Sequence, residues 1–167
     1  MKLITSKYAV VQKSRIHHNG MFATIDIPKG TEIIEYVGER ITKKLALKRA
    51  NEAEKASEKN HSKGAVYLFE INKKYDIDGD VPWNTAKYIN HSCDPNCETE
   101  QDEKDKIWIT SMGNIKKGEE ITYNYCYDID VSEDHPCKCG TLRCVGYIAD
   151  EKDWPKLKKK LEKNKKL

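Results

Sequence analysis

The sequence has little that would build a large apolar core or cross a membrane. Only 38% of its 167 residues are hydrophobic, and it contains just two phenylalanines and five prolines. No run approaches the roughly 18 apolar residues of a membrane span, so we expect no transmembrane helix. Residues 1–12 lack an uninterrupted apolar stretch and do not resemble a secretory signal. We therefore expect an intracellular protein of one domain, with a modest core that a bound metal could help to stabilise.

Net charge is small in the body of the chain, and net positive charge is concentrated near one end. Residues 151–167 carry eight lysines against three acidic residues, a net charge of +5, which leaves −2 of the total +3 for residues 1–150. A weakly acidic body suits a basic protein substrate better than a nucleic acid. We expect no membrane partner and at most weak nucleic-acid binding through the lysine-rich tail, whose simplest role is solubility.

Short β-type runs alternate with turn signals over most of the chain. One helix is predicted over 42–60, which is rich in Ala, Lys, Leu and Glu and lacks Gly and Pro. Trp154, Leu157 and Leu161 recur at helical spacing, which predicts a terminal helix packed on the body. The pattern indicates a mainly β fold (β+α) with one inserted helix. The predicted strands are 8–12, 21–24, 32–37, 65–72, 75–77, 106–112 and 120–127, and the predicted turns are 18–20, 28–30 and 78–80.

Three of the six cysteines fall within eight residues, as Cys137-Lys-Cys139-Gly-Thr-Leu-Arg-Cys144. In a chain without a secretion signal, such a cluster indicates metal binding before disulfides. A structural zinc site is tetrahedral and closed, so it needs a fourth ligand. The candidates are Cys93, Cys97, Cys126 and His135. Reduced, semi-buried thiols are the simpler alternative.

The segment from Tyr88 to Cys97 contains the block Asn-His-Ser-Cys-Asp-Pro-Asn-Cys and resembles the signature of SET-domain methyltransferases. Further segments resemble the family in the same order along about residues 14–148. Two details depart from it, because Asn19 stands beside a single Gly20 and Lys87-Tyr88 replaces a common Arg-Phe pair. The further matching segments are 18–23, 34–39, 67–69, 78–84, 118–125 and the cysteine-rich 137–144.

The resemblance implies a fold of several small sheets with a pseudoknot and a C-terminal zinc-binding post-SET segment. It places the SET domain at 8–128, the post-SET zinc segment at 133–148 and a basic helix or tail at 150–167. No pre-SET cysteine cluster precedes the domain in this sequence, so we expect a minimal version of the family.

The implied activity is S-adenosylmethionine-dependent methylation of a protein lysine, with a histone tail as the expected partner. Tyr125 matches the catalytic tyrosine, and Tyr67 matches a wall of the lysine channel. Tyr123 matches the second catalytic position, where the family has Tyr or Phe. A Tyr at that position favours monomethylation, since its hydroxyl can hold the amine and leaves less room for methyl groups.

The resemblance also assigns binding residues. Cys93 matches the remote zinc ligand beside Cys137, Cys139 and Cys144, which leaves Cys97 and Cys126 as spare thiols. The cofactor-binding positions are Asn19, Gly20, Met21, Tyr36, Tyr88, Asn90, His91 and Tyr125.

The sequence also allows three alternatives to a histone methyltransferase, two within the resembled family and one outside it. The chain could methylate a non-histone protein, or it could be an inactive SET-like module that only binds. A zinc-stabilised nucleic-acid binder would use the tail, and strong salt-sensitive affinity for DNA would indicate it. The expected location is nuclear or chromosomal in a eukaryote, and cytoplasmic or delivered to a host in a bacterium.

Overall fold

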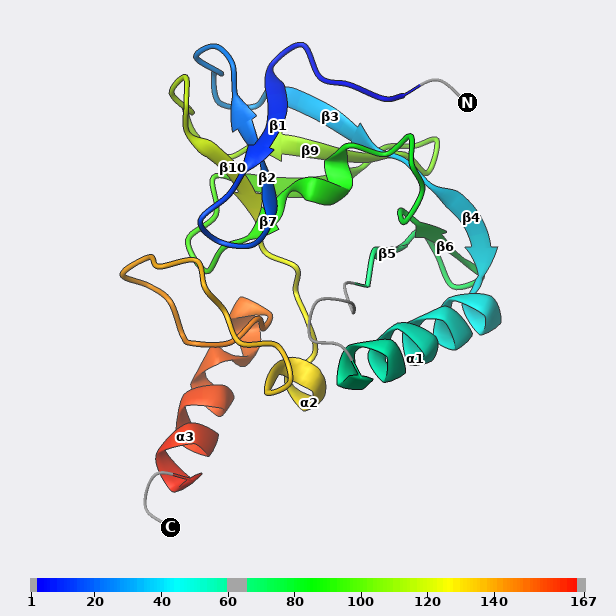
Figure 1. Cartoon of the computed structure of the whole chain (residues 1–167), viewed down its shortest axis with the longest axis vertical. Coiled ribbons are helices and arrows are strands. Elements are labelled where there is room, and N and C mark those ends of the chain that lie inside the picture. The colour runs from blue at the N-terminus through cyan, green and yellow to red at the C-terminus, as the bar shows by residue number, and fades with distance from the viewer. Residues whose placement is uncertain (1–2, 60–65, 165–167) are drawn as a thin grey trace.

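Short strands dominate the part of the chain that the computed structural model describes, residues 3–59 and 66–164 (Figure 1). The strands are β1 (Ala9–Lys13), β2 (Asn19–Ala23), β3 (Glu32–Tyr36), β4 (Glu39–Thr42), β5 (Leu68–Glu70), β6 (Tyr75–Asp78), β7 (Asn90–His91), β8 (Cys97–Gln101), β9 (Ile107–Ser111) and β10 (Glu120–Tyr123). The helices are α1 (Lys43–Lys59), α2 (Ile129–Ser132) and α3 (Trp154–Asn164), with 3-10 turns η1 (Ala86–Tyr88) and η2 (Glu151–Asp153).

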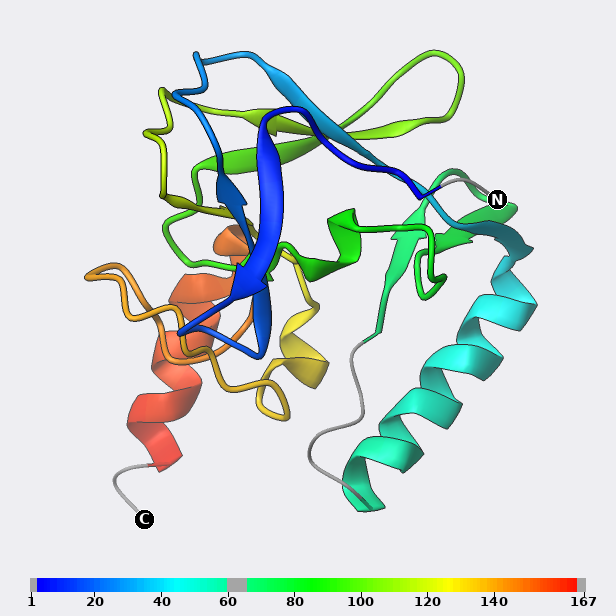
Figure 2. The ribbon, with the colours of Figure 1, turned by 45° about the horizontal axis from the view of Figure 1, so that its top comes forward.

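The strands form three small sheets, with the orders β1-β2-β10-β7, β3-β9-β8 and β4-β6-β5. The pairings within the sheets are antiparallel except for β7 and β10, which run parallel and align Asn90 with Thr122 and His91 with Tyr123. Figures 1 and 2 show α1 and α3 on the same side of the sheets, at opposite ends of the molecule. The predicted fold class, small sheets with an inserted helix and a cysteine-bearing C-terminal segment, is therefore confirmed.

The main core lies where the sheets meet. Its centre is built from isoleucines, including Ile109 and Ile121, which are fully buried. Ile33 and Ile34 are adjacent in sequence yet both buried, because the register of β3 against β9 shifts between Glu32 and Ile34. Such a bulge breaks the alternation of side chains between the two faces of β3, so two adjacent isoleucines can both point into the core. Branched side chains thus compensate for the low hydrophobic content by packing densely at a few positions.

The inserted helix is held to the sheet β4-β6-β5 mainly by charge, because Ala46 is the only buried apolar residue among its described side chains. Lys43 at its first turn pairs with Asp76 at 2.6 Å and with Glu70 at 2.8 Å. Arg49, two turns on, pairs with both Glu39 and Asp78. Asp76 and Asp78 are the buried partners, so these ion pairs fix where α1 begins over the sheet.

The C-terminal segment has a second, separate core. Trp154 and Leu157 are buried on α3 and pack with Leu161 against the cysteine loop and Ala149. The predicted terminal helix thus packs on the cysteine loop, and Cys93 is the buried residue of the main body in the same cluster. The opposite face of the helix carries its exposed lysines.

Several local predictions were wrong or too long. The predicted turn 18–20 is displaced, because the β1–β2 connection lies at 14–18 while Asn19 and Gly20 already pair in β2. Strand 120–127 ends at Tyr123, and strand 65–72 is reduced to Leu68–Glu70. Sequence patterns did not predict β4, β7 or β8, whose polar residues become strands only by pairing with a neighbour. Residues 60, 65 and 165–167, at the ends of three predicted elements, lie outside the described residues.

None of the helices in the described part of the chain is long and apolar enough to cross a bilayer.

Candidate active site and metal site

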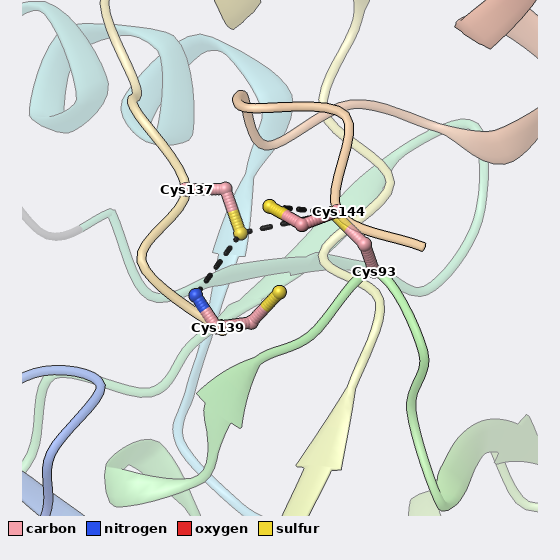
Figure 3. A group of neighbouring side chains, drawn as sticks. All are labelled: Cys93, Cys137, Cys139 and Cys144. Atoms are coloured by element: carbon pink, nitrogen blue, oxygen red, sulfur yellow. Dashed lines mark hydrogen bonds between the residues drawn. The ribbon is translucent and has the colours of Figure 1, made fainter. Parts of the chain in front are cut away.

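Four cysteine thiols from two distant parts of the chain meet in one cluster (Figure 3). Cys137, Cys139 and Cys144 come from the loop before α3, and Cys93 follows strand β7. The four sulfur atoms all lie within 4.8 Å of one another. The arrangement joins the C-terminal segment to the main body, and the cluster could hold one metal ion.

The spacing of the sulfurs fits a tetrahedral ion. Cys93 Sγ lies 3.7 Å from Cys137 Sγ and 4.0 Å from Cys144 Sγ. Zinc–sulfur bonds of about 2.3 Å at tetrahedral angles require sulfur–sulfur separations of about 3.8 Å. Burial raises the pKa of Cys93 to about 11, so a cation is needed to hold its thiolate at neutral pH. Cys97 and Cys126 lie outside this cluster.

The loop that carries three of the thiols is itself braced. Cys137 Sγ accepts a hydrogen bond from the backbone N–H of Cys139 at 3.4 Å, and Cys144 Sγ accepts one from Gly146. Gly140 has φ +70, the left-handed conformation in which glycine is least strained. These contacts set the sulfurs on one side of the loop before any ion arrives.

Tyr125 lies just beyond the end of β10, in the middle of a chain of aromatic rings. Its ring centroid is 5.0 Å from that of Tyr123, 5.5 Å from His91 and 5.8 Å from Tyr127. Its hydroxyl donates to the carbonyl of Ile89 at 2.9 Å, which fixes its direction. Burial raises the pKa of Tyr125 far above that of a free phenol, so the hydroxyl stays neutral at physiological pH.

Tyr123 packs between Tyr125 and Phe69, with 5.8 Å between the centroids of Tyr123 and Phe69. Its side chain is buried, and burial raises its pKa well above the ordinary value. Among the described residues, the Tyr123 hydroxyl has no hydrogen-bond partner. With no partner among those residues, the Tyr123 hydroxyl can form a hydrogen bond with a polar group that enters the aromatic cluster.

Tyr36 lies behind this cluster. Tyr36 is 2% exposed, and its ring centroid lies 4.5 Å from that of Phe69. Its hydroxyl donates to the carbonyl of Tyr67 at 3.1 Å. Gly79 makes this placement possible, because any side chain at that position would overlap the Tyr36 ring. The contact supports the backbone of Tyr67, whose half-buried ring also lies 5.6 Å from Lys87 Nζ.

The segments predicted to bind a cofactor converge at one end of the sheet β1-β2-β10-β7. The Asn90 side-chain amide donates to the Asn19 carbonyl at 3.0 Å, and the backbone N–H of Tyr125 donates to His91 Nδ1 at 3.2 Å. Burial lowers the pKa of His91 to about 4, so its ring is neutral. Met21 is fully buried in the core, which leaves only its backbone for a ligand. Tyr88, at the end of η1, is half-buried.

Asn96, inside the signature block, ties that block to β10. Its Oδ1 accepts from the backbone N–H of Thr122 at 2.9 Å, and its Nδ2 donates to the carbonyl of Glu120 at 2.9 Å. The Asn96 side chain thus makes the hydrogen bonds to the β10 backbone that a neighbouring strand would otherwise make. This role was missed from the sequence, because an Asn in a Pro-containing block indicates a turn and not a partner for a strand.

A groove of about 310 Å³ lies beside Tyr67, between α1 and the segment leading into β5. Acidic side chains line it, among them Glu52, Asp78 and Asp80, with Arg49 as the basic residue in its lining. Each of these carboxylates already has a basic partner: Asp78 pairs with Arg49, Glu52 with Lys48 at 3.8 Å and Asp80 with Lys87 at 3.0 Å.

This arrangement of small sheets, signature block and tyrosines places the chain in a known class. Residues 18–126 match the model of the SET domain family, and the chain belongs to that family. It is 40% identical over 136 residues to histone-lysine N-methyltransferase 2D of Homo sapiens, covering 79% of this chain and 2% of that protein. It is 41% identical over 140 residues to histone-lysine N-methyltransferase set-2 of Caenorhabditis elegans, covering 81% and 9%.

A third relative is the histone-lysine N-methyltransferase of Schizosaccharomyces pombe that is named H3 lysine-4 specific. It is 38% identical over 141 residues, covering 81% of this chain and 14% of the relative. The chain therefore spans only a small part of the length of these curated relatives. The predicted family membership is confirmed.

Proposed function

We propose that this chain transfers a methyl group from S-adenosylmethionine to the ε-amine of a lysine in a protein. The observation that carries the proposal is the position of Tyr125. Its hydroxyl is held on Ile89, its backbone is held on His91, and its ring stands between the predicted cofactor segments and the aromatic cluster.

The proposed cofactor supplies a methyl group activated by a positively charged sulfur. The backbone of Asn19 and Gly20, together with Tyr88, Asn90 and His91, would hold it. The Tyr125 hydroxyl donates its proton to Ile89, so its lone pairs remain available for weak CH···O contacts that align a methyl group.

The substrate lysine must reach this point as a neutral amine. A free lysine has a pKa of roughly 10.4, and an apolar channel disfavours its charged form. Tyr67, Phe69 and Tyr123 supply such walls, and the Tyr123 hydroxyl can accept or donate a hydrogen bond to the amine. Alignment of the reacting groups can contribute about 7–11 kcal/mol to lowering the barrier, so no strong base is required.

We propose histone H3 as the substrate, with its lysine-4 side chain as the methylated group, because relatives of this chain are named for that specificity. A chromatin location follows from such a substrate. Zinc is the metal we propose for the four cysteines, since a closed site of four thiolates suits it.

The test is transfer of label from methyl-labelled S-adenosylmethionine to core histones, and to H3 peptides in which the proposed target lysine is kept or replaced by arginine. Tyr125→Phe should lower kcat by a factor on the order of 10²–10³, the usual loss for one preorganised hydroxyl or amide group. Tyr8→Phe is the matched control, since the Tyr8 hydroxyl makes no hydrogen bond among the described residues.

Label on a lysine that Tyr125→Phe abolishes and Tyr8→Phe preserves would support the proposal. Transfer that persists on the peptide lacking the target lysine would refute the choice of lysine alone. Cofactor binding without transfer to any histone would refute the histone substrate. Absence of cofactor binding would refute the activity and favour a binding module.

A further inference from the structure

Glu120, the first residue of β10, has a role that neither sequence pattern nor family signature assigned. Its carboxylate lies against the β1–β2 connection, where its two oxygens make three short contacts. Oε1 accepts from Asn90 Nδ2 at 2.7 Å and from Ser14 Oγ at 2.7 Å, and Oε2 lies 2.9 Å from the same hydroxyl. No lysine or arginine in the described part of the chain forms an ion pair with it.

Each partner of Glu120 holds a different part of the connection. Ser14 Oγ accepts from the backbone N–H of Ile16 at 2.9 Å, and the Ser14 N–H donates to the His18 carbonyl at 3.1 Å. Asn90 Nδ2 also reaches the Asn19 carbonyl at 3.0 Å. The single carboxylate therefore links the first turn of the connection, its last residues and β7.

Gly20 lies directly over this carboxylate. A Cβ at position 20 would overlap Glu120 Oε1 and lie 2.8 Å from Glu120 Cδ, with Ser14 Cβ at 3.0 Å. Gly20 is buried, and its φ is not among the positive values. The space that its missing side chain leaves is thus filled from inside the protein by Glu120. The absence of a Cβ at this position therefore leaves room for the carboxylate.

We infer that Glu120 is the positioning residue for the cofactor-binding segments, and that Gly20 is a glycine because Glu120 occupies the place of its side chain. This inference rests on the proposed function, since it concerns how Asn19, Gly20 and Asn90 are held for the cofactor. Glu120 acts through Ser14 and Asn90 and touches no reacting atom.

The test is a double-mutant cycle on positions 20 and 120. S-adenosylmethionine affinity is measured by calorimetry, and Tm is measured on each protein. Gly20→Ala should weaken cofactor binding at least tenfold because it displaces the carboxylate. Glu120→Ala should weaken it about tenfold, with KM for the cofactor rising and kcat changing by less than threefold. The double variant should match Glu120→Ala within threefold, because the added methyl group then no longer overlaps the carboxylate and meets only Ser14 Cβ, at 3.0 Å.

Two further variants sharpen the cycle. Glu120→Gln keeps an acceptor for Asn90 and should recover most of the affinity, because the inferred role needs the acceptor oxygen and not the charge. Glu103→Ala removes an exposed acidic residue of the β8–β9 turn and should bind like the unaltered protein. If Gly20→Ala unfolds the chain, the same cycle is scored on Tm, where Glu120→Ala should restore folding.

The inference is overturned if the effects of the two substitutions simply multiply, or if Gly20→Ala binds cofactor normally. Equal binding by Glu120→Ala and the unaltered protein also overturns it. Failure of the proposed function looks different, because the unaltered protein itself would then fail to bind S-adenosylmethionine.

Discussion

The imidazole of His91 points its Nε2 at the sulfur of Cys93, 3.6 Å away. Because Nδ1 of the same ring accepts the backbone N–H of Tyr125, the neutral ring carries its proton on Nε2 and directs it at the thiol. One side chain therefore joins a proposed metal ligand to the backbone of the proposed methyl-transfer tyrosine. Such outer contacts orient metal ligands and reduce the charge on a bound thiolate.

Removing one thiol of the cluster should release the metal and loosen the C-terminal segment. We expect one zinc per unaltered chain, and Cys139→Ser should lose it and lower Tm. Cys126→Ser is the control, since Cys126 is exposed and outside the cluster. Elemental analysis and a colorimetric zinc assay measure the content. Full zinc occupancy in Cys139→Ser would contradict the four-thiolate site.

Leu157→Ala should destabilise the same segment without touching a ligand. Leu157 is 0% exposed and packs α3 on the cysteine loop. Truncating a fully buried leucine costs about 2–5 kcal/mol, measured as the free energy of unfolding in urea. Arg143→Ala, which removes exposed ion pairs to Asp94 and Glu151, should cost less than about 1 kcal/mol. Equal costs would mean that α3 is held by charge and not by packing.

Tyr123→Phe should shift the product toward di- and trimethyllysine. The substitution keeps the packing on Phe69 and Tyr125 but removes the hydroxyl that we propose contacts the amine. Mass spectrometry of the methylated peptide measures the distribution, with Tyr127→Phe as the comparison. Trimethyllysine as the main product of the unaltered protein would contradict the role of the hydroxyl.

Stability should fall on the alkaline side, above about pH 10. Burial raises the pKa of Tyr127 to about 12, raises those of Tyr36 and Tyr125 further, and raises that of Tyr123 well above its ordinary value. Above pH 10 the unfolded chain loses these phenolic protons while the folded chain keeps them, so unfolding is favoured. Each such phenol contributes roughly 1.4 kcal/mol per pH unit until its folded pKa is reached. Phenolate absorbance should therefore rise in two phases, the second coinciding with loss of near-ultraviolet circular dichroism. A single phase near pH 10 in the folded protein would contradict burial of the four rings.

The sequence was sufficient for the family, the inserted helix and the four thiols of the cysteine cluster, three of them through local spacing and Cys93 through the family resemblance. It failed where long-range pairing decided the outcome. Asn19-Gly20 has the composition of a turn but pairs with β1, and the polar β8 is a strand because β9 lies beside it. Glu120 could not be recognised, since an acidic residue opening a strand usually faces solvent. Its partners Ser14 and Asn90 are 106 and 30 residues away.

The position of Cys93 has a consequence for how the chain matures. The other three thiols lie more than forty residues later, and Cys93 directly follows β7, whose pairing with β10 holds this segment in the main body. Binding of one ion by all four thiols therefore indicates that the main body has folded. Under zinc starvation, chains should accumulate with a finished body and an undocked C-terminal segment, which a protease would trim first.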